Sequence, residues 1–151
     1  MRDLRFEGDP ILLETARVVD RFDEGLAALV RDMFETMYAA PGRGLAAPQV
    51  GISQRVFVVD TEWKEADPVP MIFVNPVVAS RAQDEVLGTE ACLSIPGKSF
   101  DVRRPAWVDM TWCDLDGASH NGRFEGVQAV CVLHELDHLN GLLITKTGTP
   151  Q

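Results

Sequence analysis

The residues of this sequence best suited to chemistry form the segment HELDH at positions 134–138. Side chains four positions apart lie on one face of an α-helix, so His134 and His138 can reach a single metal ion. Glu135 follows the first histidine and can act as a general base on water beside that ion. The pattern also occurs by chance, and the alternative is a pair of surface histidines on a solvated helix. We favour the metal site because the surrounding segment is largely apolar and holds two of the chain's three histidines.

A third ligand decides the class of such a site. Metallohydrolases with this pattern often take it downstream, as a glutamate or a third histidine. Here position 144 is isoleucine, and none of the residues from Leu139 to Gln151 is Asp, Glu, His or Cys. The third ligand must therefore come from upstream.

The three cysteines are the first candidates for that upstream ligand. Cys131 lies roughly 10 Å from His138 along a helix axis, at about 1.5 Å per residue, so its thiol cannot share an ion with both histidines. It is better read as a core or pocket-lining residue. Cys113 is expected in the core of a strand, and His120 is expected to be exposed beside a turn. Cys92 lies between an acidic residue and a Pro-Gly turn, where backbone can approach a ligand, but spacing does not settle the choice.

Two helices are predicted to frame these residues. The helix that carries the histidines runs from about residue 127 to residue 140 and ends at Gly141. An amphipathic helix begins after Asp23, where apolar residues recur every three or four positions, and is stopped by Pro41 and Gly42.

The remaining segments are predicted to be short strands and loops. Strands are expected at 55–60, 71–78, 106–115 and 122–125, with a hairpin turn at Asp116-Gly117 before the last. Residues 1–19 are read as an extended lead-in, 42–51 as a glycine-rich turn and 61–70 as a surface loop. This order predicts one α+β domain over residues 1–151, with short, mostly antiparallel strands packed around the central HExxH helix.

Composition and charge narrow the possible partners. The net charge is −9, which argues against nucleic acid, because phosphate binding needs clustered Lys and Arg. No run of 18 apolar residues could span a membrane, and the charged N-terminus is unlike a secretory signal. Three cysteines without a CxxC pair favour a reducing compartment over a disulfide framework. We therefore expect a cytoplasmic protein without nucleic-acid or membrane partners.

Three ordered segments resemble the motifs of the peptide deformylase family. The family pattern GxGxAAxQ is matched by GRGLAAPQ at 42–49, EGCLS by EACLS at 90–94, and QHExDHLxG by LHELDHLNG at 133–141. Their order and spacing fit, and the resemblance covers nearly the whole chain. Three such motifs together are far more specific than HExxH alone.

The resemblance implies an enzyme that hydrolyses the formamide bond of N-formylmethionyl peptides, rather than a main-chain peptide bond, and releases formate. It selects Cys92 as the third ligand of one divalent ion. The family's preferred metal is Fe²⁺, and Zn²⁺ or Ni²⁺ can also occupy the site. Glu135 would take the proton of the attacking water and return it to the departing amine. The Leu93 backbone N–H and the Gln49 amide would stabilise the oxyanion.

The resemblance also assigns the substrate contacts. The backbone at Gly44 would pair with an extended peptide, which suits a residue without a side chain. Val127, Val130 and Cys131 would line an apolar pocket for the methionine side chain, although plain core packing explains them equally well. The implied partners are formylated nascent or short peptides.

Three positions depart from the family pattern. Leu133 replaces a glutamine, Ala91 replaces a glycine, and Arg43 occupies a usually apolar position beside the cleft. The chain also stops at Gln151, short of a C-terminal helix that many bacterial members associate with ribosome docking, so ribosome contact through it is not expected. The alternatives are a divergent paralogue acting on another small formyl or amide compound, and a catalytically weak metal-binding homologue.

Overall fold

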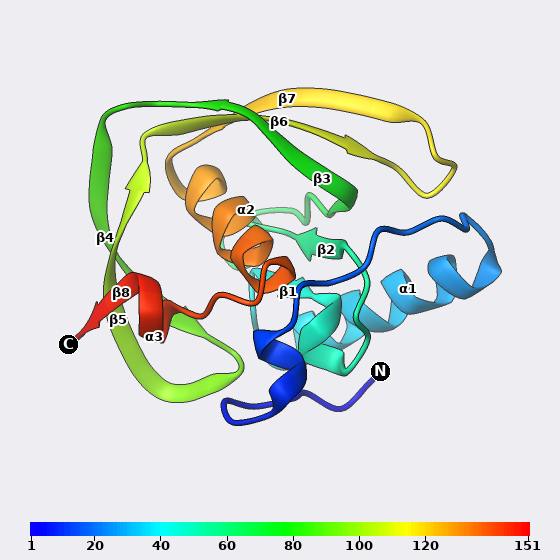
Figure 1. Cartoon of the computed structure of the whole chain (residues 1–151), viewed down its shortest axis with the longest axis horizontal. Helices are drawn as coiled ribbons and strands as arrows, with labels where there is room; N and C mark the ends of the chain where they lie inside the picture. The colour runs from blue at the N-terminus through cyan, green and yellow to red at the C-terminus, as the bar shows by residue number, and fades with distance from the viewer.

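Eight strands form two antiparallel sheets, and the helix α2 (Gly126–Leu139) lies between them (Figure 1). The computed structural model describes residues 1–151. The other elements, in chain order, are η1 (Pro10–Leu13), α1 (Glu24–Ala39), β1 (Gly44–Ala46), η2 (Ala47–Val50), β2 (Val56–Val59), β3 (Met71–Arg81), β4 (Glu85–Cys92), β5 (Ile95–Pro105), β6 (Trp107–Cys113), β7 (Ser119–Glu125), α3 (Ile144–Thr147) and β8 (Gly148–Pro150). The predicted α+β class with mostly antiparallel strands is confirmed.

The larger sheet has the order β1-β2-β3-β6-β7 and carries a helix on each face. All four residues of β2 are buried, because successive side chains of a strand point to opposite faces. Phe57 and Val59 pack with the apolar side of α2, whereas Val56 and Val58 pack with α1. Because the two faces of β2 are buried against different helices, both helices are fixed relative to the strands.

The smaller sheet has the order β4-β5-β8 and packs over a third apolar cluster. Phe100 and Val102 of β5 meet Leu12 of η1 and Leu143 and Ile144 near the C-terminus. Strand β4 pairs only with β5, and β1 pairs only with β2, so each sheet keeps an edge strand. Both of these edge strands contribute residues to the cleft described below.

Helix α1 follows the predicted apolar stripe. The Asp23 side chain accepts a hydrogen bond from the Leu26 backbone N–H at 3.1 Å and caps the first turn. The buried positions of the helix are Leu26, Leu29, Val30, Met33, Thr36 and Met37. The helix ends at Ala39, shortly before Pro41.

Gly141, two residues after the end of helix α2, lies where any side chain would clash. Gly141 adopts φ +73°, and a Cβ atom there would lie 2.5 Å from the Leu13 carbonyl oxygen. The Arg55 guanidinium also donates a 3.0 Å hydrogen bond to the Leu139 carbonyl at this end of the helix. These contacts hold the C-terminal turn, which carries His138, against the N-terminal segment.

Strands β4 and β5 were not predicted. Five of the first six side chains of β4 are exposed, so the strand lacks the alternating apolar pattern that signals burial. In β5 the Pro96-Gly97 pair reads as a turn, and the buried face includes Arg104 in place of an apolar residue. The pairing of β4 with β5 therefore could not be predicted from the local sequence pattern.

Several smaller expectations are also corrected. The segment 42–51 is not a simple turn, because it holds β1 and η2 and is mostly buried. The lead-in 1–19 contains η1, and α3 and β8 add two short elements near the C-terminus. Cys113 is only partly buried at the end of β6, whereas His120 is exposed as expected and lies 2.8 Å from Asp114. No helix is long and apolar enough to cross a membrane.

Candidate metal centre

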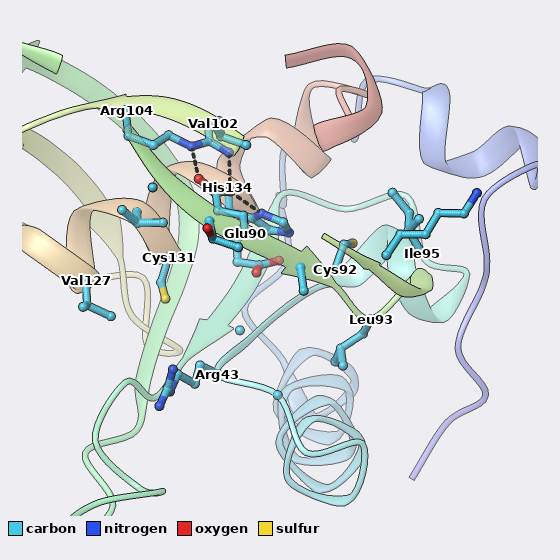
Figure 2. A pocket seen from close by; sticks show the side chains of 18 of the residues that line it. Arg43, Glu90, Cys92, Leu93, Ile95, Val102, Arg104, Val127, Cys131 and His134 are labelled. Atoms are coloured by element: carbon cyan, nitrogen blue, oxygen red, sulfur yellow. Dashed lines mark hydrogen bonds and ion pairs between the residues drawn. The ribbon is translucent and has the colours of Figure 1, made fainter. Parts of the chain in front are cut away.

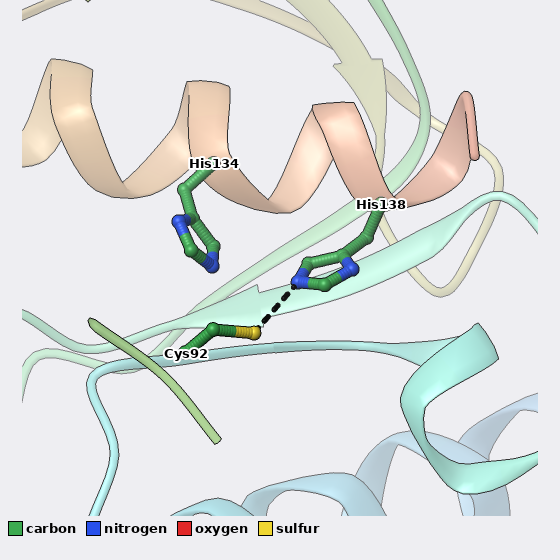
Figure 3. A group of neighbouring side chains, drawn as sticks. All are labelled: Cys92, His134 and His138. Carbon is green, nitrogen blue, oxygen red and sulfur yellow. Dashed lines mark hydrogen bonds between the residues drawn. The ribbon is translucent and has the colours of Figure 1, made fainter. Parts of the chain in front are cut away.

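Three potential ligands from two elements converge on one point (Figure 3). His134 and His138 lie on successive turns of α2, and Cys92 is the last residue of β4. One ligand atom from each lies within 4.8 Å of the others, and the Cys92 Sγ atom is 3.4 Å from His138 Nε2. All three residues are buried, with exposed fractions of 1% to 9%.

A buried network behind His134 orients its ring (Figure 2). The His134 Nδ1 atom lies 2.9 Å from the Glu90 carboxylate, which leaves Nε2 free to face an ion. Arg104 donates two 2.9 Å hydrogen bonds to the same carboxylate and a 2.6 Å bond to Asp137 of α2. The ion pairs therefore join β4, β5 and α2 directly behind the first histidine.

Burial and charge shift the acidity of these groups. Burial alone would raise the pKa of Glu90, but hydrogen bonds from Arg104 and His134 outweigh it and lower the pKa to about 2. Burial opposes protonation of His134 too, yet its contacts with Cys92 and Glu90 raise its pKa to about 10. Burial and the nearby His134 hold the pKa of His138 well below its usual value. A histidine that binds a metal must be a neutral imidazole, so an ion bound here would take the place of the proton on His134.

Glu135 is enclosed beside the two histidines. Its side chain is 4% exposed, its Oε1 atom has no hydrogen-bond partner, and burial raises its pKa to about 7. A Cβ atom on Gly44 would lie 2.5 Å from Glu135 Oε2. Glycine at position 44 therefore makes room for the carboxylate.

Gln49 is locked with its amide nitrogen toward the cysteine. Its Oε1 atom accepts a hydrogen bond from the Ala46 backbone N–H at 2.9 Å, and its Nε2 atom donates to Ser94 Oγ at 3.0 Å. The same nitrogen lies 3.8 Å from Cys92 Sγ. Leu93 follows the cysteine and also borders this space.

A cleft of about 1050 Å³ opens onto this centre (Figure 2). It brings together all but one of the site residues predicted from sequence: Gly44, Gln49, Cys92, Leu93, Val127, Val130, Cys131, His134 and Glu135. His138 lies behind the cleft wall and is 1% exposed. Cys131 is not among the converging ligand atoms, and burial raises the pKa of its thiol to about 12.

Glu90 and Arg104 are functional residues that the sequence reasoning missed. Glu90 lies two positions before Cys92, and the HELDH segment contains Asp137, so two members of the network had a local signal. Arg104 had none, because it belongs to a strand that was not predicted.

The structure explains two of the three departures from the family pattern. Leu133 is 5% exposed and packs in the core between α2 and the larger sheet. Ala91 needs no glycine, because Asn75 is the only non-glycine residue with positive φ. Arg43 borders the cleft and pairs with Glu65 at 2.6 Å.

The donor set fits a divalent ion. A cysteine sulfur with two imidazoles is a ligand combination suited to Zn²⁺ and related transition metals. The fixed His134 ring, the lowered pKa of His138 and the unpartnered oxygen of Glu135 suit such a centre. An antiparallel α+β fold with this cluster on an HExxH helix is typical of a mononuclear metallohydrolase.

Comparison with known proteins defines the family. The polypeptide deformylase family model matches residues 1–151. The peptide deformylase of Zymomonas mobilis is 47% identical over 139 residues, which cover 89% of this chain and 78% of that protein. The crystal structure of the Thermotoga maritima peptide deformylase superposes with a TM-score of 0.94 at 37% identity and covers 99% of both chains. A class I type b peptide deformylase from Acinetobacter baumannii matches with a TM-score of 0.90 at 32% identity, over 97% of this chain and 98% of that one. The chain belongs to the peptide deformylase family.

Proposed function

We propose that this protein is a metal-dependent hydrolase that removes the formyl group from formylmethionyl peptides. Water is added across the formamide C–N bond, giving formate and a peptide with a free amino terminus, and no main-chain peptide bond is broken. The observation that carries the proposal is the convergence of Cys92, His134 and His138 beside the enclosed carboxylate of Glu135. Membership of the deformylase family over the whole chain supports it.

Cys92, His134 and His138 would hold one divalent ion, with Fe²⁺ as the proposed metal in the cell and Zn²⁺ or Ni²⁺ as alternatives. The bound ion supplies Lewis acidity, which lowers the pKa of water and polarises a carbonyl oxygen. All three cysteines of the chain are free, which agrees with a reducing compartment such as the cytoplasm.

Glu135 would move the proton during hydrolysis. Its Oε1 atom has no partner within the protein and is therefore free to accept the proton of the attacking water. The protonated carboxyl would then give this proton to the amine nitrogen as the C–N bond breaks. Gly44 assists by leaving the space that the carboxylate occupies.

Gln49 and Leu93 would stabilise the charge that develops on the formyl oxygen. The hydrogen bonds of Gln49 to Ala46 and Ser94 fix its amide, so the N–H group on the side of Cys92 would be the donor to the oxyanion. The Leu93 backbone N–H follows directly after Cys92 and would supply a second donor.

The formylated residue would be held in the cleft. Val127 is 59% exposed and lines the cleft with Val130 and Cys131, which favours a binding pocket over plain core packing. Gly44 lies in the edge strand β1 and would offer its backbone to an extended peptide. The Acinetobacter baumannii relative was crystallised with Met-Ala-Ser bound. This peptide is the product that deformylation of formyl-Met-Ala-Ser would leave in the cleft.

Formate release from formyl-Met-Ala-Ser by protein loaded anaerobically with Fe²⁺ tests the proposal. We expect turnover with the metal-loaded protein and none after removal of the metal with a chelator. Tight metal binding without hydrolysis of this peptide would contradict the proposal. Turnover of another formylated compound alone would favour a divergent paralogue.

A further inference from the structure

The rim of the cleft carries positive charge, although the chain as a whole has a net charge of −9. Lys64 and Lys98 are exposed at the rim, and Arg43 lies between the rim and the proposed methionine pocket. The acidic groups that line the cleft are buried, and one of them, Glu90, is already paired with an arginine. The exposed charged side chains that line the cleft are therefore cations, which favours anionic groups at the entrance, although Glu65 already occupies part of Arg43.

The backbone at Arg43 is held in place beside the cleft. Its carbonyl accepts a hydrogen bond from the Asp60 backbone N–H at 2.8 Å, and the neighbouring Gly42 carbonyl accepts one from the Trp63 indole at 2.9 Å. The Arg43 Nη2 atom donates to Glu65 at 2.6 Å. The first two contacts fix the backbone, and the ion pair with Glu65 places the guanidinium beside the cleft, away from the Arg104 network in Figure 2.

The pairing of Arg43 is incomplete. Its Nε atom is buried and has no hydrogen-bond partner. Its one ionic partner, Glu65, is 65% exposed, and water screens such a pair strongly. Because that Nε atom is covered, a second acceptor arriving through the cleft would meet the Nη groups of the guanidinium, which are the donors that match a carboxylate.

We propose that Arg43 is a specificity-determining residue that selects peptides with a carboxylate next to the formylated residue. The inference rests on the proposed function, in which a peptide pairs with the backbone of Gly44. A peptide paired with β1 would lie about 4.7–4.9 Å from it, which is within the length of the arginine side chain that precedes Gly44. In this proposal Lys64 and Lys98 attract anions in general but do not contact the substrate carboxylate.

Two amidated peptides, formyl-Met-Glu-Ser and formyl-Met-Gln-Ser, test the selection on the metal-loaded protein. They differ in charge and almost not in size. We expect kcat/KM to be at least about fivefold higher for the glutamate peptide and this ratio to fall as salt is added. Formyl-Met-Ala-Ser as the free acid and as the amide tests the other source of a carboxylate, the end of a short peptide. A preference in the glutamate pair supports the proposal, whereas a preference for the free acid alone overturns it and assigns the selection to the end of the peptide.

Matched variants assign the preference to Arg43. Arg43→Gln should lower the ratio to about one, and Arg43→Lys should retain part of it. Glu65→Gln should raise the ratio, because it removes the competing carboxylate. Arg103→Gln removes the same charge from an exposed position of β5 that does not line the cleft, and should leave the ratio unchanged. An unchanged preference in Arg43→Gln overturns the proposal.

Binding of the unformylated amides Met-Glu-Ser and Met-Gln-Ser separates this inference from the proposed function. Their dissociation constants need no turnover and should show the same preference. If no formyl peptide is hydrolysed but this preference persists and depends on Arg43, the inference stands and the proposed function fails. Equal dissociation constants together with equal kcat/KM values overturn the inference alone.

Discussion

The two halves of helix α2 differ in exposure, although they belong to one continuous element. The C-terminal half carries His134, Glu135 and His138, which are between 1% and 9% exposed. The N-terminal half carries Val127, which is 59% exposed, and Val130, which is partly buried beside the same cleft. The first group is enclosed by both sheets, whereas the second group faces open space.

The proposed roles of the two halves account for this difference. A metal centre needs ligands fixed in place, so its residues are supported by ion pairs from β4 and β5 and by packing against the larger sheet. A substrate pocket needs surface that can be uncovered without unfolding the chain. We therefore expect substitutions in the C-terminal half to abolish chemistry and those in the N-terminal half to change selectivity.

The largest effect is expected for Cys92→Ala. Loss of the sulfur leaves two imidazoles on α2, so the variant should retain almost no metal and no measurable formate release. Cys131→Ala is the matched control in the open half of the helix and should bind metal with normal stoichiometry. The measurement is the metal content of the two purified variants. Metal retained in Cys92→Ala and lost in Cys131→Ala would show that the ligand assignment is wrong.

Glu135→Ala should abolish chemistry while sparing the metal. General acid–base catalysis typically contributes about 10²–10⁴ in rate, and kcat should fall by about that factor. Metal content should match the parent protein, because no ligand is removed. A kcat within tenfold of the parent value would rule out Glu135 as the group that moves the proton.

Gln49→Leu tests the second side of the centre, which comes from η2 rather than from α2. Loss of one oxyanion donor costs about 10²–10³ in kcat, and we expect a loss in this range with metal retained. Ser94→Ala removes the hydrogen-bond partner of the Gln49 amide but leaves the amide itself, so its effect should be under about tenfold. Equal losses in both variants would point to a structural role for this pair.

Glu90→Gln should affect stability and its dependence on pH. The pKa of Glu90 is about 2 in the folded chain against 4.5 unperturbed, so folding favours the ionised form. This contribution is complete above pH 4.5 and is lost as the pH falls toward 2. At about 1.4 kcal/mol per pKa unit it amounts to roughly 3 kcal/mol.

Urea unfolding between pH 7 and pH 2 measures this contribution. Glu90→Gln should be less stable at pH 7 and should lose less stability on acidification than the parent protein. Glu85→Gln, an exposed change in the same strand, should follow the parent curve. Parallel curves for Glu90→Gln and the parent would contradict the role of the buried network.

The smallest effect is expected in the open half of α2. Val130→Ala removes two methyl groups from the proposed methionine pocket, at about 0.8 kcal/mol for each buried carbon. We expect kcat/KM for formyl-Met-Ala-Ser to fall by up to about tenfold, mainly through KM, with metal content unchanged. A loss of metal in this variant would show that the two halves are not independent.

Local sequence determined the parts of this protein in which residues of one kind recur every three or four positions. The apolar stripe of α1 and the four-residue spacing of His134 and His138 follow from helix geometry, which each segment carries within itself. The absence of any ligand type after His138 also needed only the sequence, and it directed the search upstream.

Tertiary structure decided the rest. Cys92 meets His138 across 46 positions because the β4–β5 hairpin docks on α2, and no local pattern encodes that approach. Arg104 is buried in an unpredicted strand since its charge is matched by Glu90 and Asp137, which only the folded chain brings within reach. A buried charge is tolerated where partners from other elements satisfy it, so its position depends on long-range contacts rather than on its neighbours in sequence.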